Sequence, residues 1–187
     1  MATMDASQVG VGSAAATGAI WVAAKTVALP TDATTALASS YTLLGFTSDA
    51  GVQISEDSST ETIRAWEGRT EVYNVRSEYT ESISFTPIQC NADVAKLIWG
   101  ADHVEVDSQT GAIHIKHHAG NLEPVHIVIE VTPRAGIVKR CCGEFQLTER
   151  GEITMDGTQV DGRQLTFKSI ADANGVTMHE YISFTSE

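Results

Sequence analysis

The sequence is poor in positive charge: its 187 residues include 12 Lys and Arg against 24 Asp and Glu, a formal net charge of −12. Proteins that grip DNA by releasing its counterions need clustered Lys and Arg, so this composition argues against a nucleic-acid-binding protein. No apolar run approaches the roughly 20 residues of a membrane span. The N-terminus shows no basic region followed by an apolar run. We therefore expect a soluble protein with no membrane partner and no secretory signal.

Cysteine is also scarce, with three residues, of which Cys141 and Cys142 are adjacent. This number and spacing fit neither a disulfide framework nor a redox or zinc pair, and free, packed thiols in a reducing cytoplasm are the simpler interpretation. The length fits one domain with a single core.

Recognisable catalytic motifs are missing, since the chain has no nucleophile elbow, phosphate loop or zinc-hydrolase helix. Histidines gather in one region of the second half: His114, His117, His118 and His126. Without a definite geometry and a carboxylate or thiolate partner, solvated histidines on a sheet edge explain them better than a metal site. Acidic residues gather further on: Glu149, Glu152 and Asp156. They are a weak calcium candidate in a chain that is acidic throughout. We predict no enzymatic activity, no cofactor and no bound metal.

The most informative pattern lies between Tyr73 and Phe85, where polar and apolar residues alternate. The odd-numbered apolar residues are Tyr73, Val75, Tyr79, Ile83 and Phe85. The even-numbered polar residues are Asn74, Arg76, Glu78, Thr80, Ser82 and Ser84. A period of two predicts a long strand with one buried face and one solvated face. Pro87, which has no N–H to donate, should end it.

A short helix over about residues 91–99 should follow this strand. Asn91 is a plausible N-cap, and Asp93 falls in the first turn, where a carboxylate suits the helix dipole. One face carries Val94, Leu97 and Ile98 at helical spacing. Gly100 can adopt the left-handed conformation that ends many helices.

The remaining pattern predicts short strands, which places the protein in the mainly β class. Strands are expected near 20–23, 41–46, 52–54, 104–106, 112–118, 125–132, 137–148, 151–155, 165–167 and 176–184. Asp172-Ala173-Asn174-Gly175 indicates a tight hairpin turn. Residues 1–18, rich in Ala, Gly, Ser and Thr, should be a flexible N-terminal arm, or an arm that orders on a neighbouring subunit. Residues 19–187 should form a single domain.

A polar, acidic stretch at about residues 55–70 is predicted to be a long loop or hairpin. It contains four residues suited to an intermolecular contact: Arg64, Trp66, Glu67 and Arg69. Long loops without their own structure are usually functional or disordered, and an exposed Trp is typical of interfaces. The alternative is that Trp66 folds back onto its own sheet.

Several segments follow one another in a recognisable order. They are the Ile20-Trp21-Val22 strand, the Leu29–Ala33 loop, the Leu44–Val52 turn, the Ile63–Gly68 segment, the strand and helix of Glu81–Gly100, and Gly151–Thr154. This order resembles the major tail protein, or tail tube protein, family of long-tailed bacteriophages. The Cys pair and the histidine-rich segment are not part of the resemblance.

The resemblance implies an antiparallel β-sandwich or partly closed barrel with one flanking α-helix. It further implies hexameric rings that stack into a tail tube, each subunit lending strands to an inner barrel through which genomic DNA passes during ejection. The implied partners are other copies of the chain, the tape measure protein, and the tail tip and terminator proteins. The implied location is the virion, after synthesis in the host cytoplasm. An acidic wall suits DNA passage, because it offers phosphates few cations.

In such a tube, the polar face of 74–84 is expected to line the lumen, and the 55–70 loop to contact a subunit of the next ring. Two alternatives remain open. A non-catalytic β-sandwich binding or decoration module would be a monomer or small oligomer with an aromatic platform. The three Trp residues instead fall in a strand, a loop and a helix. A related tube protein of a contractile or secretion system is the other alternative.

Overall fold

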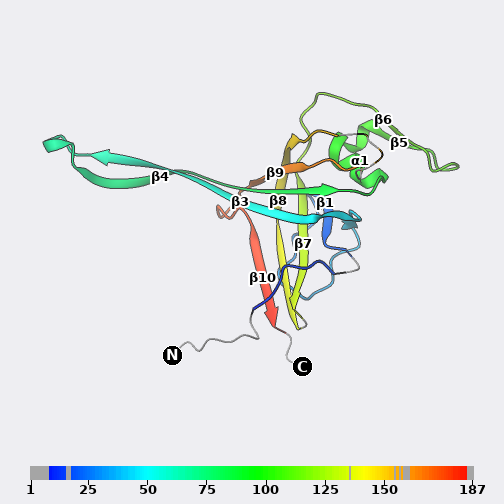
Figure 1. The fold of residues 1–187 in the computed structure, drawn as a ribbon, viewed down its shortest axis with the longest axis horizontal. Coiled ribbons are helices and arrows are strands. Elements are labelled where there is room, and N and C mark those ends of the chain that lie inside the picture. Colours follow the sequence, from blue (N-terminus) through cyan, green and yellow to red (C-terminus); the bar gives the residue numbers. More distant parts are fainter. Residues whose placement is uncertain are drawn as a thin grey trace.

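Strands make up half of the described chain. The computed structural model describes residues 9–15, 18–134, 136–153, 155, 157 and 161–184. The strands are β1 (Ile20–Ala24), β2 (Thr42–Leu43), β3 (Thr47–Arg64), β4 (Glu71–Pro87), β5 (Val104–Val106), β6 (Ile113–Ile115), β7 (Val125–Arg134), β8 (Ile137–Arg150), β9 (Leu165–Ile170) and β10 (His179–Phe184). The helical elements in this part of the chain are α1 (Ala92–Trp99) and the 3-10 turns η2 (Glu67–Arg69) and η3 (Ala101–His103). The predicted mainly β class is confirmed (Figure 1).

Eight strands form one antiparallel sheet in the order β2-β1-β7-β8-β9-β4-β3, with β10 also paired to β8. The short strands β5 and β6 form a separate hairpin that packs near α1. Within the described residues the large sheet is open, because β2 and β3 lie at opposite ends of its order. Ile20 of β1 and Ile83 of β4 nevertheless belong to one buried cluster. The sheet therefore folds over on itself into a sandwich-like body.

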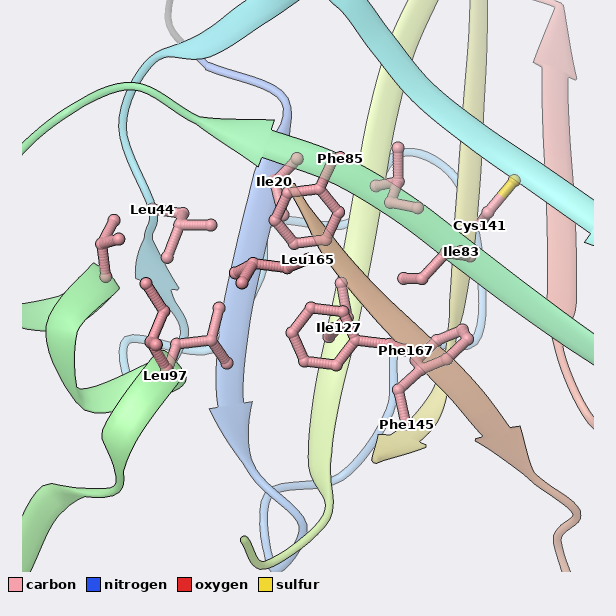
Figure 2. Packing of buried hydrophobic residues seen from close by; sticks show 13 residues of the cluster. Ile20, Leu44, Ile83, Phe85, Leu97, Ile127, Cys141, Phe145, Leu165 and Phe167 are labelled. Atoms are coloured by element: carbon pink, nitrogen blue, oxygen red, sulfur yellow. The ribbon is translucent and has the colours of Figure 1, made fainter. Parts of the chain in front are cut away.

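The core lies between the folded-over parts of this sheet (Figure 2). Phe85 of β4 stacks on Phe167 of β9, with ring centroids 5.5 Å apart. Ile127 of β7 and Phe145 of β8 are buried beside them, and Leu97 of α1 closes one end. Burying each of these large apolar side chains stabilises the fold by about 1.5–3 kcal/mol. The core thus draws on strands from across the sheet.

The predicted helix is present, and its cap is the predicted one. The Oδ1 atom of Asn91 accepts a hydrogen bond from the backbone N–H of Val94 at 2.7 Å. The side-chain amide of Asn91 also donates to the carbonyl of Leu44 at 3.1 Å, which ties the start of α1 to the loop after β2. Gly100 ends the helix with a φ of 89°, a conformation that favours glycine. No helix in the described part of the chain is long and apolar enough to cross a membrane.

Strand β8 holds two strands along one edge. Its second half pairs with β9, and its first half pairs with β10. The expected hairpin between the last two strands is therefore wrong: the turn at Asp172–Gly175 exists, with the Asp172 carboxylate accepting from the backbone N–H of Asn174 and Val176, but it connects strands that lie end to end. The turn chemistry was predicted correctly and the pairing was not, because an Asx turn fixes only the local backbone direction.

Two other expectations fall on segments that the structure describes in part. Of the proposed N-terminal arm, Met1–Gln8, Ala16 and Thr17 lie outside the described residues. Residues 11–14 run beside the end of β7: Val11 donates to Pro133 at 2.9 Å, and Thr132 donates to Ser13 at 2.9 Å. The strand expected at 151–155 is absent from its described residues, 151–153 and 155.

The largest departure from expectation is the segment predicted as a loop at 55–70. Residues 55–64 belong to β3, which pairs with β4 far beyond the body of the protein, so that only residues 65–70 form the connection. The resulting hairpin projects away from the rest of the molecule (Figure 1). Its polarity suggested a loop because a strand exposed on both faces has no apolar side to reveal it.

Candidate assembly interface

The projecting hairpin packs against no other described part of its own chain. Every side chain from Gln53 to Tyr79 is exposed except that of Ala65, which is partly exposed. We call residues 53–79 the arm. A two-stranded ribbon is only marginally stable by itself in water, so burial against another molecule would stabilise it.

The tip of the arm is a tight turn with an unusual backbone. Gly68 and Arg69 both have positive φ angles, 64° and 54°. Left-handed geometry is strained for a residue with a Cβ, so Arg69 is held there by its surroundings. The N–H of Ala65 donates to the carbonyl of Thr70 at 2.8 Å and closes the turn. The tip is therefore a defined structure.

The four residues predicted to make an intermolecular contact all lie at this tip. Trp66 is 95% exposed, so the alternative that it folds back onto its own sheet is wrong. Arg64 pairs with Glu71 across the two strands, with an N–O distance of 2.6 Å. Glu67 and Arg69 complete the turn beside Trp66. An exposed Trp between charged groups has the composition of an interface anchor.

The pairing of the two strands shifts by one residue at two points inside the arm, between Ser59 and Thr60 and between Ile63 and Arg64. The first shift lies closer to the body. Ser59 stands opposite Glu78, whereas the next residue of β3, Thr60, stands opposite Arg76. Ser77 is thus an extra residue on β4, a β-bulge, and its hydroxyl oxygen lies 2.7 Å from that of Ser59. Because side chains alternate between faces, one extra residue moves every later side chain of that strand to the other face.

Because of this bulge, the residues expected to line a lumen lie on two different faces of the ribbon. Directly opposed residues share a face. The partners of Ile54, Glu56, Ser58, Thr60 and Thr62 along β3 are Ile83, Glu81, Tyr79, Arg76 and Asn74. Asn74 and Arg76 therefore share the face of the buried Ile83, which we call the core-side face. The others lie on the opposite, outer face: Glu78, Thr80, Ser82 and Ser84. The expectation of one continuous polar face over 74–84 is wrong.

Where the outer face crosses the body, it remains polar. Ser82 stands opposite Lys168 of β9, and Ser84 stands opposite Thr166. Lys168 is exposed, whereas Thr80, Ser82 and Ser84 are partly buried. The sequence pattern found the three hydroxyl residues but could not place a lysine from a distant strand beside them.

Two residues that the sequence analysis did not single out determine the geometry of the arm. Ser77 makes the bulge, and Glu81, 7% exposed, fixes the point where the arm leaves the body. The Glu81 carboxylate accepts a hydrogen bond from the hydroxyl of Thr177, and its backbone carbonyl accepts one from Ser169 Oγ at 2.9 Å. A signal for both was present, because they are the polar residues that interrupt the odd-numbered apolar series.

The other candidate clusters do not assemble a reactive site. His117 stacks on Trp99, His118 stacks on His103, and His126 is buried with Nδ1 2.7 Å from the carbonyl of Val27. In the described part of the chain no three His, Cys, Asp or Glu residues converge to hold a metal ion. Of the proposed calcium ligands, Asp156 lies outside the described residues.

The adjacent cysteines are packed, as predicted. Cys141 and Cys142 are free thiols buried in the body. Burial raises the pKa of each to about 11 from an ordinary value of 9.0. A thiol with so high a pKa forms little thiolate at neutral pH and is a poor nucleophile.

Comparison with known proteins decides the class. A family model described as "Phage tail tube protein" matches residues 2–186. The chain belongs to this family. The protein is therefore a structural component of the virion tail and not an enzyme. No curated protein matches its sequence. Among the solved structures that match is a chain titled "Virion of native gene transfer agent (GTA) particle", 14% identical, covering 80% of this chain and 92% of that chain, with a TM-score of 0.41.

Membership of the tail tube family gives the exposed arm a context. A tube is built from repeated copies of its subunit, so each surface left uncovered in one copy is available to another. Within the described residues of the large sheet, β2, β3 and β10 each pair along one edge only, and the two longer of these strands, β3 and β10, leave extended edges open. Open edges of this length promote uncontrolled association unless another chain covers them.

Proposed function

We propose that copies of this chain form hexameric rings that stack into the tail tube, and that genomic DNA passes through the lumen during ejection. The observation that carries the proposal is the arm: in a chain of the tail tube family, a long ribbon that packs on none of the other described residues of its subunit ends in an exposed Trp. The open strand edges of β3 and β10 supply the lateral contacts that close a ring. The tape measure, tail tip and terminator proteins are the partners that such a tube requires.

The arm makes the contact between rings in this proposal. The tip residues Arg64, Trp66, Glu67 and Arg69 dock on a subunit of the next ring, where Trp66 supplies the apolar anchor. Aromatic residues in a fully desolvated pocket account for much of the binding energy of typical interfaces. The fixed root at Glu81 aims the ribbon, and the ribbon itself can bend as a flexible tail bends.

The outer face over Thr80, Ser82 and Ser84 lines the lumen. Its hydroxyl groups present no charge to DNA, and the net charge of −12 keeps the wall as a whole from attracting phosphates. Lys168 lies beside these hydroxyl residues, opposite Ser82. With few cations on this surface, DNA slides past it without binding tightly. Asn74 and Arg76 lie on the core-side face and are not part of this proposed surface.

The proposal is tested by removing the outer part of the arm without disturbing the body. Ser59 and Glu78 are directly opposed, so residues 60–77 can be replaced by Asn-Gly, a two-residue connection that suits a hairpin. We expect a folded monomer by circular dichroism and ultracentrifugation. In electron micrographs of concentrated protein seeded with tail tips, it should form no tubes, whereas wild type should. Tubes of normal length from the shortened variant would contradict the proposed role of the arm.

A point variant separates the anchor from the ribbon. Trp66→Ala removes a side chain that touches little of its own subunit, so the free energy of unfolding should change by less than about 0.5 kcal/mol. The protein concentration needed for tube formation should rise at least about tenfold, as expected when an interface anchor is lost. Equal assembly by both proteins would assign the contact to another part of the arm.

A further inference from the structure

The bulge at Ser77 divides the arm into two parts of different chemistry. We call residues 60–76 the distal arm, and residues 53–59 with 77–79 the proximal arm. The proximal arm carries three carboxylates, Glu56, Asp57 and Glu78, and no Lys or Arg. The distal arm balances three glutamates with three arginines: Glu61, Glu67, Glu71, Arg64, Arg69 and Arg76. In a chain of net charge −12, the distal arm is neutral.

The bulge also changes which face of the ribbon is apolar. In the body, the apolar side chains of β4 point to the core-side face with Ile83. Beyond the bulge, Tyr73 opposes Ile63 and Val75 opposes Glu61, and both pairs lie on the outer face. The exposed fractions of Ile63, Tyr73 and Val75 are 51%, 66% and 39%. Followed along the ladder toward the tip, the outer face therefore turns from polar to apolar.

We infer that the outer face of the distal arm, carrying Ile63, Tyr73 and Val75, binds a second copy of this chain, and that the Ser77 bulge exists to place these side chains on that face. The inference rests on the proposed role of the arm and adds which side of the ribbon is covered. If Ser77 were instead paired as an ordinary residue of the ladder, the same sequence would carry Tyr73 and Val75 on the core-side face with Ile83.

The charges favour a second copy as the partner. Two chains that each carry −12 repel one another, and the proximal arm, with three carboxylates and no cation, shares that repulsion. The neutral distal arm can approach the acidic body of another subunit without this repulsion, and its three arginines can pair with carboxylates of that subunit. A nucleic acid is a poorer partner, because the arginines are balanced by glutamates and Arg64 is already paired with Glu71.

Two length variants separate the face from the bulge itself. Deleting Ser77 removes the bulge, because Glu78 and Arg76 then alternate directly, and it leaves Tyr73 and Val75 on the outer face. Inserting one Ser between Ser59 and Thr60 also removes the bulge, since Ser77 gains a partner, but it moves every distal side chain to the other face. Both variants keep the composition of the arm nearly unchanged.

We expect the deletion to form tubes within about threefold of the wild-type protein concentration and the insertion to form none below about tenfold that concentration, with both proteins folded by circular dichroism. Exchanging neighbours 62 with 63, 73 with 74, and 75 with 76 in the insertion variant returns the apolar residues to the outer face and should restore assembly. This exchange controls for the small outward shift that an inserted residue causes.

A second comparison needs no change in length. The double variant Tyr73→Thr/Val75→Thr removes apolar area from the outer face while keeping β-forming residues, and Asn74→Thr alters the core-side face between them. The double variant should need at least about tenfold more protein to assemble, and Asn74→Thr should behave as wild type.

The outcomes distinguish the two levels of proposal. Tubes from wild type and equally from the insertion variant would overturn the face assignment alone, as would loss of tubes from the folded deletion variant. If the insertion variant fails to fold, normal assembly of the Tyr73→Thr/Val75→Thr variant overturns the assignment. Wild-type protein that stays monomeric under all conditions overturns the proposed function, and the face assignment with it.

Discussion

Strand β4 passes through two environments within 17 residues. From Glu81 to Pro87 every second side chain is buried, whereas from Glu71 to Tyr79 every side chain is exposed. The same alternation of polar and apolar residues runs through both halves. In the body it stabilises the subunit, because the apolar side chains join one buried cluster with residues of β1, β7 and α1. In the arm it leaves apolar side chains exposed for another molecule, and the contrast shows that alternation specifies a strand but not what covers it.

The largest effect expected from this contrast is on stability. Phe85→Ala removes a buried ring that stacks on Phe167 and should lower the free energy of unfolding by about 3–5 kcal/mol. Tyr73→Ala, on the same strand, should change it by less than about 0.5 kcal/mol. Urea denaturation of dilute, unassembled protein measures both. A large loss from Tyr73→Ala would mean that the arm packs on its own body.

A second stability prediction tests whether helix α1 belongs to the core of the body. Leu97 is buried at the end of the core, so Leu97→Ala should cost about 2–5 kcal/mol in the same experiment. Lys96, on the exposed side of α1, is the matched control, and Lys96→Ala should cost less than about 0.5 kcal/mol. A loss below about 1 kcal/mol from Leu97→Ala would move the helix from the core to an interface.

Local chemistry made much of this fold predictable. The Asn91 cap, the apolar face of α1 and the turn at Asp172–Gly175 depend on residues close in sequence, and all three are present. Strand pairing was harder to predict from the sequence. The same turn would allow β10 to pair with β9 as a hairpin or to pair with β8, as it does in the structure. That choice depends on contacts across the whole sheet.

The candidate interface was predictable in composition and not in geometry. The sequence singled out Trp66 and its charged neighbours, and the structure brings them together at one tip. It did not show that the polar stretch before them is a strand, since neither face of the ribbon is buried. The sequence analysis also did not predict the bulge, which determines the face on which each distal side chain lies. Ser77 breaks the apolar series, but one polar residue in a strand does not by itself indicate an unpaired position.

A smaller effect tests the proposed lumen, where the outer face lies on the body and not on the arm. Thr80→Lys/Ser84→Lys adds two cations per subunit on that face, flanking Ser82 and its neighbour Lys168. Assembled tubes should then bind DNA with an affinity that falls steeply with salt, because phosphates release counterions. The control Ser108→Lys/Gln109→Lys adds the same charge at the exposed turn between β5 and β6. Equal DNA binding by both variants, measured on intact tubes, would place the outer face away from the lumen.

The smallest effect concerns the buried thiols, which belong to the body alone. Burial raises the pKa values of Cys141 and Cys142 in the folded protein to about 11, from an ordinary value of 9.0. The unfolded chain therefore loses these protons at lower pH than the folded chain. Their contribution to stability is complete below about pH 9 and should be lost as the pH rises from about 9 to 11.

Thermal midpoints measured across that range should fall for wild type and equally for the variant with residues 60–77 replaced by Asn-Gly, since the arm holds no cysteine. Cys141→Ala/Cys142→Ala should start lower, because two buried side chains are truncated, and should fall less steeply. A slope that survives the double substitution would assign the alkaline loss to other groups, among which Tyr41, whose pKa burial also raises, is the first to replace.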